Sequence, residues 1–327
     1  MVSLIITCYN SEKYIERCLN SVLNQVDKDI ELIMVNDGST DNTANIIKQY
    51  YSKLEDSLTK FIYIEQENQG VGSACNNAFK KVTGKYLTLL DSDDVMLPDS
   101  ILERRIWLEK HPSFGLVRTN GYYITEDNYN HSKTLFEVND YMKIKEDIFE
   151  ELLYGKTYVW PGSYMIRMSV LDKIYPDREI YPSRSGQNLQ FLMMAAYKSR
   201  AGFIDKPLME YFVRKESLSH FSKGDVLSKE IRAMQGYKDI RCYLIKSFIP
   251  KEEQVEWNER INKLYAKIYL EIAIKYKDKY KAKKYYKEIQ SLYNGSPELN
   301  IEILYYKLIN PFKYYFLRLM RKTGLRK

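Results

Sequence analysis

The feature that most constrains the fold is a fourfold alternation of a short apolar run with a helical pattern in the first hundred residues. The apolar runs have the length and residue types of buried strands, and the segments between them place apolar residues at helical spacing. Strands that alternate with helices predict a doubly wound α/β domain with a mainly parallel sheet. The four runs are VSLIIT, IELIMV, FIYIE and YLTLL.

Each run is followed by a polar loop, in order TCYN, NDGST, ENQGVG and DSDD. In a doubly wound sheet, ligands bind in the crevice beyond the carboxyl ends of the strands. We therefore expect the four loops to meet at one edge. Each loop alone is weak evidence for a ligand site, but four polar loops at the same edge together are stronger evidence for one.

The loop DSDD places Asp91, Asp93 and Asp94 at the end of an apolar strand. Carboxylates this close together stay ionised only beside a cation or hydrogen-bond donors. Mn²⁺ or Mg²⁺ takes one or two carboxylates and completes its shell with phosphate oxygens and water. The alternative is that Asp91 or Asp94 caps the next helix. Capping explains only one of the three residues, so the loop predicts a metal and diphosphate site.

The other loops offer weaker signals. Asp37 in NDGST is either part of a plain turn or an acceptor for a ring N–H of a nucleotide base. Thr7 and Tyr9 flank the same position, where Tyr9 has a ring that could stack on a base. The glycines of NQGVG would let backbone N–H groups approach an anion at the start of the following helix.

The distribution of charge separates the end of the chain from the rest. The net charge is +7, and residues 303–327 contain seven basic residues and no acidic one. A nucleic-acid reader more often carries its charge on a folded face, so we expect no nucleic-acid partner. No apolar run reaches the roughly 18 residues of a membrane span, and no secretory signal is evident, so we expect a cytoplasmic protein.

On a helix starting near Pro311, five apolar or aromatic residues would cluster on one side: Phe312, Tyr315, Phe316, Leu319 and Met320. With the basic residues around them, this is the pattern of a segment lying in a membrane interface. It predicts peripheral attachment through 303–327 to the inner face of the cell membrane. The alternatives are a helix that docks on its own domain and, more remotely, RNA binding.

Four stretches, SLIITCYNSEKYIERCLNSVLNQ, ELIMVNDGSTDNT, NQGVGSACNNAF and GKYLTLLDSDD, resemble the nucleotide-sugar-binding half of the family 2 glycosyltransferases. The resemblance is close over 1–125 and looser to about 220. It implies the A-type glycosyltransferase fold, an α/β domain with a doubly wound, mixed, mainly parallel sheet. We expect a catalytic domain over 1–222, with nucleotide-sugar binding in 1–125 and the acceptor side in 126–222. From about Lys223 onward the residues themselves are helix-forming and rich in Lys, Glu and Tyr, which predicts a helical extension over 223–300 before the basic amphipathic tail over 301–327.

The resemblance also implies roles for single residues. Thr7, Tyr9 and Asp37 would hold the base of a nucleoside diphosphate sugar, usually UDP-linked. Asp91 would lie near the ribose, and Asp93 would bind the Mn²⁺ or Mg²⁺ that bridges the diphosphate, with Asp91 and His220 as further metal candidates. The remaining predicted nucleotide-sugar contacts are Asn10, Asn68, Gly70, Asn76, Ser92, Gly162, Ser163 and Arg214.

Two departures from the family pattern bear on activity. Cys75 stands where an arginine is usual, and Gln187 and Asn188 stand where an acidic pair commonly supplies the general base. An amide cannot accept a proton at neutral pH. We expect Gln187 and Asn188 to line the pocket. Three explanations for the missing acidic pair stay open. The stretch aligns with the family pattern in a different register, Asp177 or Glu179 supplies the general base, or the base lies elsewhere in the chain.

Three functional hypotheses follow from this pattern. The first is an inverting glycosyltransferase that acts on a hydroxyl of a lipid-linked or growing surface glycan. The second is a non-catalytic nucleotide-sugar-binding or scaffold relative. The third is a phosphate-transferring or nucleotide-hydrolysing enzyme.

Overall fold

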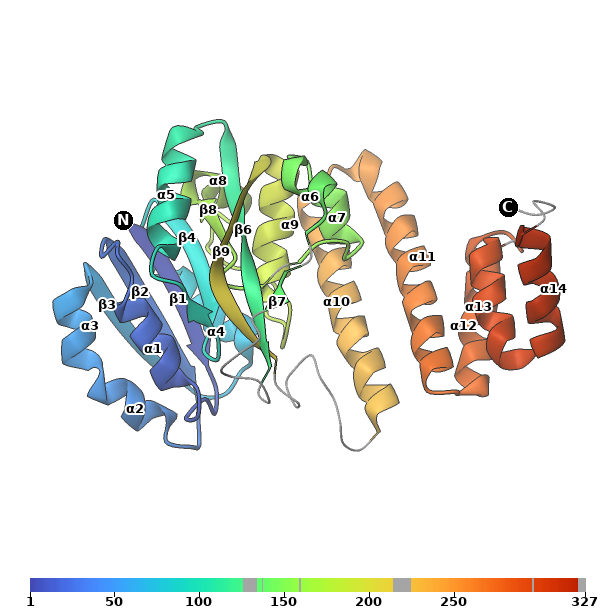
Figure 1. The fold of residues 1–327 in the computed structure, drawn as a ribbon, viewed down its shortest axis with the longest axis horizontal. Helices are drawn as coiled ribbons and strands as arrows, with labels where there is room; N and C mark the ends of the chain where they lie inside the picture. The colour runs from blue at the N-terminus through green and yellow to red at the C-terminus, as the bar shows by residue number, and fades with distance from the viewer. Residues whose placement is uncertain (126–133, 137, 159, 214–224, 296, 323–327) are drawn as a thin grey trace. The chain divides into compact units, whose positions relative to one another are not determined.

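A computed structural model describes residues 1–125, 134–136, 138–158, 160–213, 225–295 and 297–322 (Figure 1). The chain forms two compact units, Met1–Lys215 and Glu216–Lys327. The first unit contains a nine-stranded sheet whose main strand order is β3-β2-β1-β4-β8-β6-β9-β5, with β7 paired to β6.

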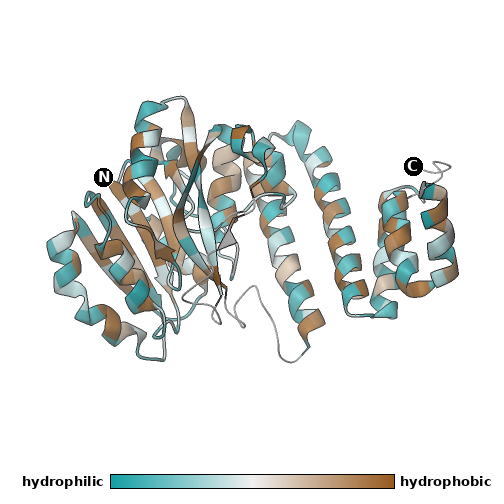
Figure 2. Ribbon diagram, in the orientation of Figure 1, coloured by the Kyte–Doolittle hydropathy of each residue, from teal (hydrophilic) through white to brown (hydrophobic). Residues whose placement is uncertain are grey.

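The first half of the sheet follows the alternation seen in the sequence. Strands β3, β2, β1 and β4 lie side by side and are parallel. Figure 2 shows β1, β2 and β4 as mostly hydrophobic ribbons, whereas β3 at the sheet's edge is more exposed. Their bounds and those of the intervening helices are β1 (Val2–Cys8), α1 (Ile15–Leu23), β2 (Ile30–Asp37), α2 (Thr43–Gln49), α3 (Tyr51–Ser57), β3 (Lys60–Gln66), α4 (Val71–Phe79) and β4 (Tyr86–Asp91).

Consecutive residues of β1, β2 and β4 are buried, as expected for a sheet covered on both faces. Leu4 and Ile6 of β1 belong to a buried cluster with Ile15 and Leu19 of α1. The small residues of α4 let that helix lie against β1 and β2. Three of the four apolar runs, β1, β2 and β4, are therefore buried strands, as the sequence predicted. The prediction is wrong for FIYIE, because β3 is the edge strand and its residues are partly or fully exposed.

The second half of the sheet is mixed. Strand β8 is antiparallel to both β4 and β6, β9 is parallel to β6, and the short β5 is antiparallel to β9. The stretch GLVRTNGYYIT lies within one continuous strand, β6, with partners on both sides. The bounds are β5 (Val95–Met96), α5 (Ser100–Lys110), β6 (Phe114–Thr125), β7 (Thr134–Leu135), α6 (Asp140–Ile144), α7 (Phe149–Leu153), β8 (Tyr164–Arg167), α8 (Met168–Ile174), α9 (Gln187–Lys198) and β9 (Arg200–Val213).

In the second unit, every element that the structure describes is a helix. Arg241 of α10 is buried and donates to the hydroxyl of Tyr265 in α11 (2.8 Å), and the rings of Tyr286 and Tyr305 stack at 3.8 Å between α12 and α13. Tyrosine thus supplies much of the packing between these helices. Their bounds are α10 (Val226–Phe248), α11 (Lys251–Lys275), α12 (Lys279–Leu292), α13 (Leu299–Ile309) and α14 (Pro311–Lys322). Across the described part of the chain, no helix combines the length and the hydropathy needed to cross a membrane.

Candidate active site

The carboxyl ends of the four parallel strands meet at one edge of the sheet. Thr7 of β1 is in register with Val35 of β2 on one side and Asp91 of β4 on the other, and Asp37 of β2 is in register with Gln66 of β3. The four polar loops therefore start side by side, as a doubly wound sheet requires.

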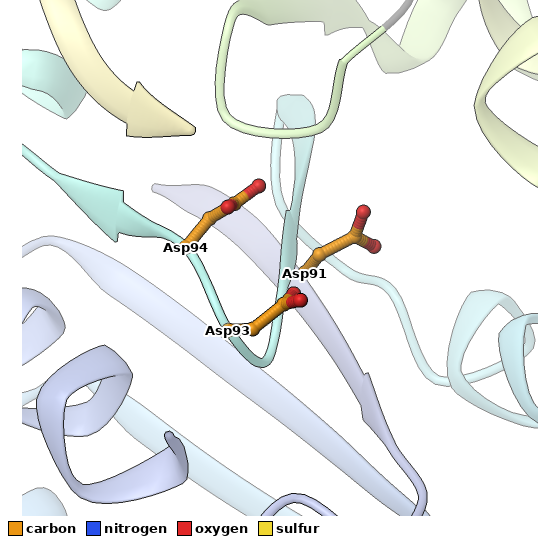
Figure 3. Close-up of side chains that lie close together, drawn as sticks. All are labelled: Asp91, Asp93 and Asp94. Carbon is orange, nitrogen blue, oxygen red and sulfur yellow. The ribbon is translucent and has the colours of Figure 1, made fainter. Parts of the chain in front are cut away.

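The acidic loop, Asp91–Asp94, brings its three carboxylates together. Strand β4 ends at Asp91, and the chain turns so that the N–H of Asp94 donates to the Asp91 carbonyl oxygen (3.1 Å). One oxygen from each of Asp91, Asp93 and Asp94 lies within 4.8 Å of the others (Figure 3). The convergence comes from this turn, because the extended strand geometry stops at Asp91. Three like charges this close repel each other unless a proton or cation joins them.

Asp94 is the most deeply placed of the three carboxyls. Its side chain is 1% exposed, and Oδ1 accepts a hydrogen bond from the backbone N–H of Phe212 (2.9 Å). Oδ2 is buried and has no hydrogen-bond partner in the described part of the chain. Burial raises the pKa of this carboxyl well above its usual range, and the neighbouring Asp93 and Asp91 raise it further.

The unpaired oxygen of Asp94 helps to decide whether this loop is a metal site or a helix cap. Asp94 does not cap α5, because that helix begins after Asp99, so helix capping does not account for it. Carboxylate oxygens are the donors that Mg²⁺ and Mn²⁺ prefer, and an unsatisfied buried oxygen beside two more carboxylates fits such a cation. The residues present therefore suit a hard divalent ion.

Arg17 of α1 lies beside this loop and was not anticipated from the sequence. Its Nη2 donates to the main-chain carbonyl of Asp93, and its guanidinium carbon lies 3.5 Å from the centre of the Phe212 ring. The positive charge partly offsets the acidic loop, because it lowers the pKa of Asp94 against the larger effect of burial. An arginine within an amphipathic helix gives no sequence signal for this contact.

The loop after β1 presents Tyr9 to solvent, with 50% of its side chain exposed. The next residue, Asn10, adopts a left-handed backbone conformation (φ +49°). Its Oδ1 accepts from the N–H of Thr40 (2.8 Å), and its own N–H donates to Ser39 Oγ (3.0 Å). Asn10 thereby joins the loops after β1 and β2 and sets the position of Tyr9.

Asp37 is buried and holds the loop that precedes α4. Its Oδ1 accepts from Gln66 Nε2 (2.8 Å) and the Gln69 N–H (2.9 Å), and its Oδ2 accepts from the Gly70 N–H (2.8 Å). The N–H of Gly70, which was expected to approach a bound anion, thus donates to a carboxylate of the protein itself. A contact from Asp37 to a nucleotide base stays a prediction and would use the free lone pair of Oδ2. Asn68, in the same loop, is exposed.

The segment before α9 is attached to α4. The N–H of Gly72 donates to the Ser183 carbonyl (2.9 Å), and a Cβ at position 72 would lie 2.5 Å from that oxygen. The side-chain amide of Asn76 bonds both the N–H and the carbonyl of Ile180 (2.8 and 2.9 Å). The structure thus gives Asn76 a supporting contact, and its predicted contact with the nucleotide sugar stays a prediction.

Gln187 and Asn188 open α9, after Gly186 in the left-handed region (φ +75°). Both side chains are buried, and Oδ1 of Asn188 accepts from the hydroxyl of Tyr164 on β8 (2.9 Å). Burial raises the pKa of Tyr164, and the nearby Cys75 and Asp91 raise it further. Tyr164 therefore stays a hydrogen-bond donor at neutral pH, and it links α9 to the strand that borders β4.

The two weak candidates for a general base lie away from this edge. Glu179 forms an ion pair with Lys80, which follows the last turn of α4, whereas the acidic loop lies near the strands' carboxyl ends and the start of that helix. Asp177, two residues earlier, is exposed.

The remaining predicted contacts fall on two loops. Ser92 Oγ is 2.8 Å from Ser11 Oγ, which joins the acidic loop to the start of the helical segment after β1. Gly162 adopts φ +83° and its N–H donates to the Leu89 carbonyl, while Ser163 Oγ donates to the Trp160 carbonyl (2.6 Å). The loop that leads into β8 therefore lies against the end of β4. Arg214 and His220 lie outside the described residues.

Comparison with known proteins gives matches of one kind. A sequence model described as glycosyl transferase family 2 matches residues 3–175. GlyA of Streptococcus pneumoniae, named a glycosyltransferase, is 30% identical over 67% of this chain, and the chondroitin synthase of Escherichia coli is 42% identical over 31% of it. The matched regions are 31% and 14% of those two proteins, so the chain spans less than a third of either relative.

Solved structures share the fold at low sequence identity. The structure of S. aureus TarS 1–349 in complex with UDP-GlcNAc matches with a TM-score of 0.65 and 17% identity, over 99% of this chain and 92% of that one. The mannosyltransferase PcManGT from Pyrobaculum calidifontis, in complex with GDP-Man and Mn²⁺, matches with a TM-score of 0.54 and 18% identity, over 97% and 82%. These likenesses show the A-type glycosyltransferase fold.

Proposed function

The chain belongs to glycosyl transferase family 2, and from this premise we propose that it transfers a hexose or N-acetylhexosamine from a UDP-linked donor. The acceptor would be a hydroxyl of a lipid-linked or growing surface glycan, and the transfer would invert the anomeric centre. Residues 1–125 would bind the donor and 126–222 the acceptor. The observation that carries the proposal is the acidic loop, where three carboxylates converge and the buried Oδ2 of Asp94 has no hydrogen-bond partner among the described residues.

Asp91 and Asp93 would hold Mn²⁺ or Mg²⁺, with Asp94 behind them. When bound, the ion stabilises the negative charge that develops on the departing diphosphate. Thr7, Tyr9 and Asp37 lie on the β1 and β2 side of the loop, where they would bind and orient the base. Asn10, which ties the two loops together, would keep Tyr9 in place for stacking.

Gln187 and Asn188 would position the acceptor hydroxyl by hydrogen bonding. The hydroxyl of Tyr164 donates to Oδ1 of Asn188 and so fixes the orientation of the side-chain amide, whose N–H₂ group would then donate to the acceptor. Neither amide can take the proton of the acceptor. This observation favours a second candidate function, a nucleotide-sugar-binding protein without turnover.

The test is turnover by purified protein with Mn²⁺ and a panel of UDP- and GDP-sugars, with donor consumption and products followed by mass spectrometry. We expect a sugar product with a UDP-sugar, and Asp93→Asn should nearly abolish it while leaving the fold intact. Asp140→Asn removes a fully exposed carboxylate and serves as the matched control. Nucleotide binding with no turnover would favour the second candidate, and fast hydrolysis without an acceptor would favour a nucleotide hydrolase.

We also propose that α14 attaches the protein peripherally to the inner face of the cell membrane. Phe312, Tyr315 and Leu319 are 90%, 67% and 59% exposed and lie on one side of the helix, while Leu317 is buried. Exposed Lys313 and Arg318 flank this stripe and would be attracted to anionic lipids by about 1 kcal/mol each.

Flotation with liposomes tests this attachment. Replacing Phe312, Tyr315 and Leu319 by serine should abolish binding to anionic liposomes, because the apolar stripe is lost while Leu317 is retained. Neutral liposomes should bind the parent protein weakly. Equal flotation of the parent and the triple variant would overturn the attachment and leave the test of turnover unaffected.

A further inference from the structure

Five aromatic rings gather at the carboxyl end of β6 and form what we term the aromatic cluster: Tyr123, Phe136, Tyr158, Trp160 and Tyr211. Phe136 is 2% exposed and lies at the centre, 4.3 Å from Trp160 and 4.8 Å from Tyr123 between ring centroids. Trp160 stacks on Tyr158 (4.7 Å, 6° between planes) and lies 5.5 Å from Tyr211. The rings come from four segments of the chain and belong to no single motif.

The aromatic cluster is partly exposed to solvent, unlike a hydrophobic core. Trp160 and Tyr211 keep part of their surface exposed, in contrast to the buried Phe136. The indole N–H of Trp160 donates to no residue in the described ranges, whereas the Tyr158 hydroxyl donates to the Thr119 carbonyl (2.5 Å). Buried tryptophans usually satisfy this N–H, so a partly exposed ring with a spare donor suits a ligand that has both an apolar face and hydroxyl groups.

The cluster borders the acidic loop. Tyr211 precedes Phe212, whose N–H bonds Asp94, and Trp160 begins the turn in which Gly162 bonds the end of β4. Figure 3 shows the loop into β8 passing close to the carboxylates and β9 ending near Asp94. In the strand order, β1 and β2 lie on one side of β4, and β6 and β9 lie on the other. The cluster is therefore across the acidic loop from the residues assigned to the nucleotide.

We propose that the aromatic cluster is a carbohydrate subsite that stacks a pyranose ring of the acceptor. The C–H face of a pyranose is apolar and carries a slight positive charge, which complements the negative face of an aromatic ring. A ring hydroxyl would accept from Trp160 Nε1, and stacking would remove water from both surfaces. The inference rests on the proposed function and deepens it, because it names the residues that would hold a sugar ring of the acceptor.

Fluorescence tests binding without any turnover. The chain has three tryptophans, so Trp107→Phe with Trp257→Phe leaves Trp160 as the sole indole emitter. This protein is titrated with the methyl glycosides of glucose, galactose, mannose and N-acetylglucosamine, and with glycerol 3-phosphate as a non-carbohydrate probe. We expect a saturable change in emission with at least one glycoside and none with glycerol 3-phosphate, and Tyr211→Ala should weaken the affinity about tenfold. No saturable change with any glycoside would overturn the inference.

Kinetics give a second readout with the glycoside that binds best as acceptor. Trp160→Phe keeps a ring but loses the N–H, and Trp160→Ala loses both. The KM for the glycoside should therefore rise modestly in Trp160→Phe and by roughly tenfold or more in Trp160→Ala, each relative to the parent. The KM for the UDP-sugar and its hydrolysis without acceptor should stay within twofold of the parent. Tyr51→Ala removes a ring from the aromatic group at the edge strand β3, which is separated from β6 and β9 by β4 in the strand order, and is the matched control.

The outcomes separate the two proposals. An equal rise of both KM values would overturn the subsite. Turnover with a non-carbohydrate acceptor and no glycoside binding would overturn the subsite and leave the transferase intact. Glycoside binding with no turnover of any donor would support the subsite and contradict the transferase.

Discussion

The backbone N–H of Phe212 on β9 donates a 2.9 Å hydrogen bond to Oδ1 of Asp94, although the two residues are 118 positions apart. The bond joins the acidic loop of the first half of the sheet to the last strand of the second half. The ring of the same phenylalanine lies under the guanidinium of Arg17, which in turn bonds the carbonyl of Asp93. The shape of the acidic loop therefore depends on contacts from both halves.

Asp94→Asn and Asp94→Ala should have different effects. Asn keeps an oxygen for the Phe212 N–H but removes the charge, so we expect a folded protein with Mn²⁺ affinity lowered about tenfold or more. Ala leaves the Phe212 N–H buried and unpaired, which should lower the free energy of unfolding by about 1–3 kcal/mol. Urea unfolding and Mn²⁺ titration by calorimetry measure the two effects. Identical stability of the two variants would contradict a structural role for the bond.

Arg17→Met should destabilise the metal-free protein by about 1–2 kcal/mol, because it removes a charge-assisted hydrogen bond and a cation–ring contact. Saturating Mn²⁺ should reduce this difference, since the ion then offsets the acidic charge in place of the guanidinium. Arg17→Lys, which keeps the charge, should fall between parent and Met. Urea midpoints with and without Mn²⁺ are the measurement, and a difference that Mn²⁺ leaves unchanged would contradict this role.

Gly72→Ala should displace the segment before α9. The added Cβ would lie 2.5 Å from Ser183 O and 2.6 Å from Ser183 N, both backbone atoms that cannot rotate away. We expect a KM for the acceptor raised several-fold and a loss of about 1–3 kcal/mol in stability. Ser73→Ala, at the neighbouring and more exposed position, should cost less than about 0.5 kcal/mol. Steady-state kinetics and thermal unfolding of both variants test this, and equal effects would refute the contact.

Glu31 on β2 should make stability depend on acid pH. Burial alone would raise the pKa of this carboxyl, but hydrogen bonds from Lys60, Ser3 and Thr83 outweigh it and lower the pKa from 4.5 to about 2. The unfolded chain then binds the proton more readily, so this stabilisation is present above pH 4.5 and is lost as the pH falls through about 2.

Glu31→Gln should accordingly lower the free energy of unfolding by about 2 kcal/mol at pH 7, and by clearly less at pH 3. Urea unfolding at the two pH values measures the difference. Because Glu31 lies near the amino end of β2, away from the acidic loop, kcat should be unchanged. A constant difference between pH 7 and pH 3 would contradict the lowered pKa.

Much of the first half of the fold was predictable because its signals are local. A run such as YLTLL is buried whatever its neighbours are, and the polar loops that follow four such runs must meet once the strands are parallel. The family resemblance of those same stretches extended the prediction to the mixed sheet, and the helix-forming residues after about 223 predicted the helical C-terminal region; both are confirmed. The individual site contacts assigned by resemblance stay predictions.

The amino-acid sequence by itself determined the parallel strands and the acidic residues at the end of β4, because these depend on neighbours within a few positions. Only the tertiary structure decided that Asp94 bonds Phe212, that Arg17 bonds Asp93 and that Trp160 lies near Tyr211. The contacts of Asp94 with Phe212 and of Trp160 with Tyr211 depend on the order β4-β8-β6-β9-β5, which is set by strand pairing between segments far apart in the chain. Such pairing has no local pattern, since its free energy arises only when the whole sheet is assembled.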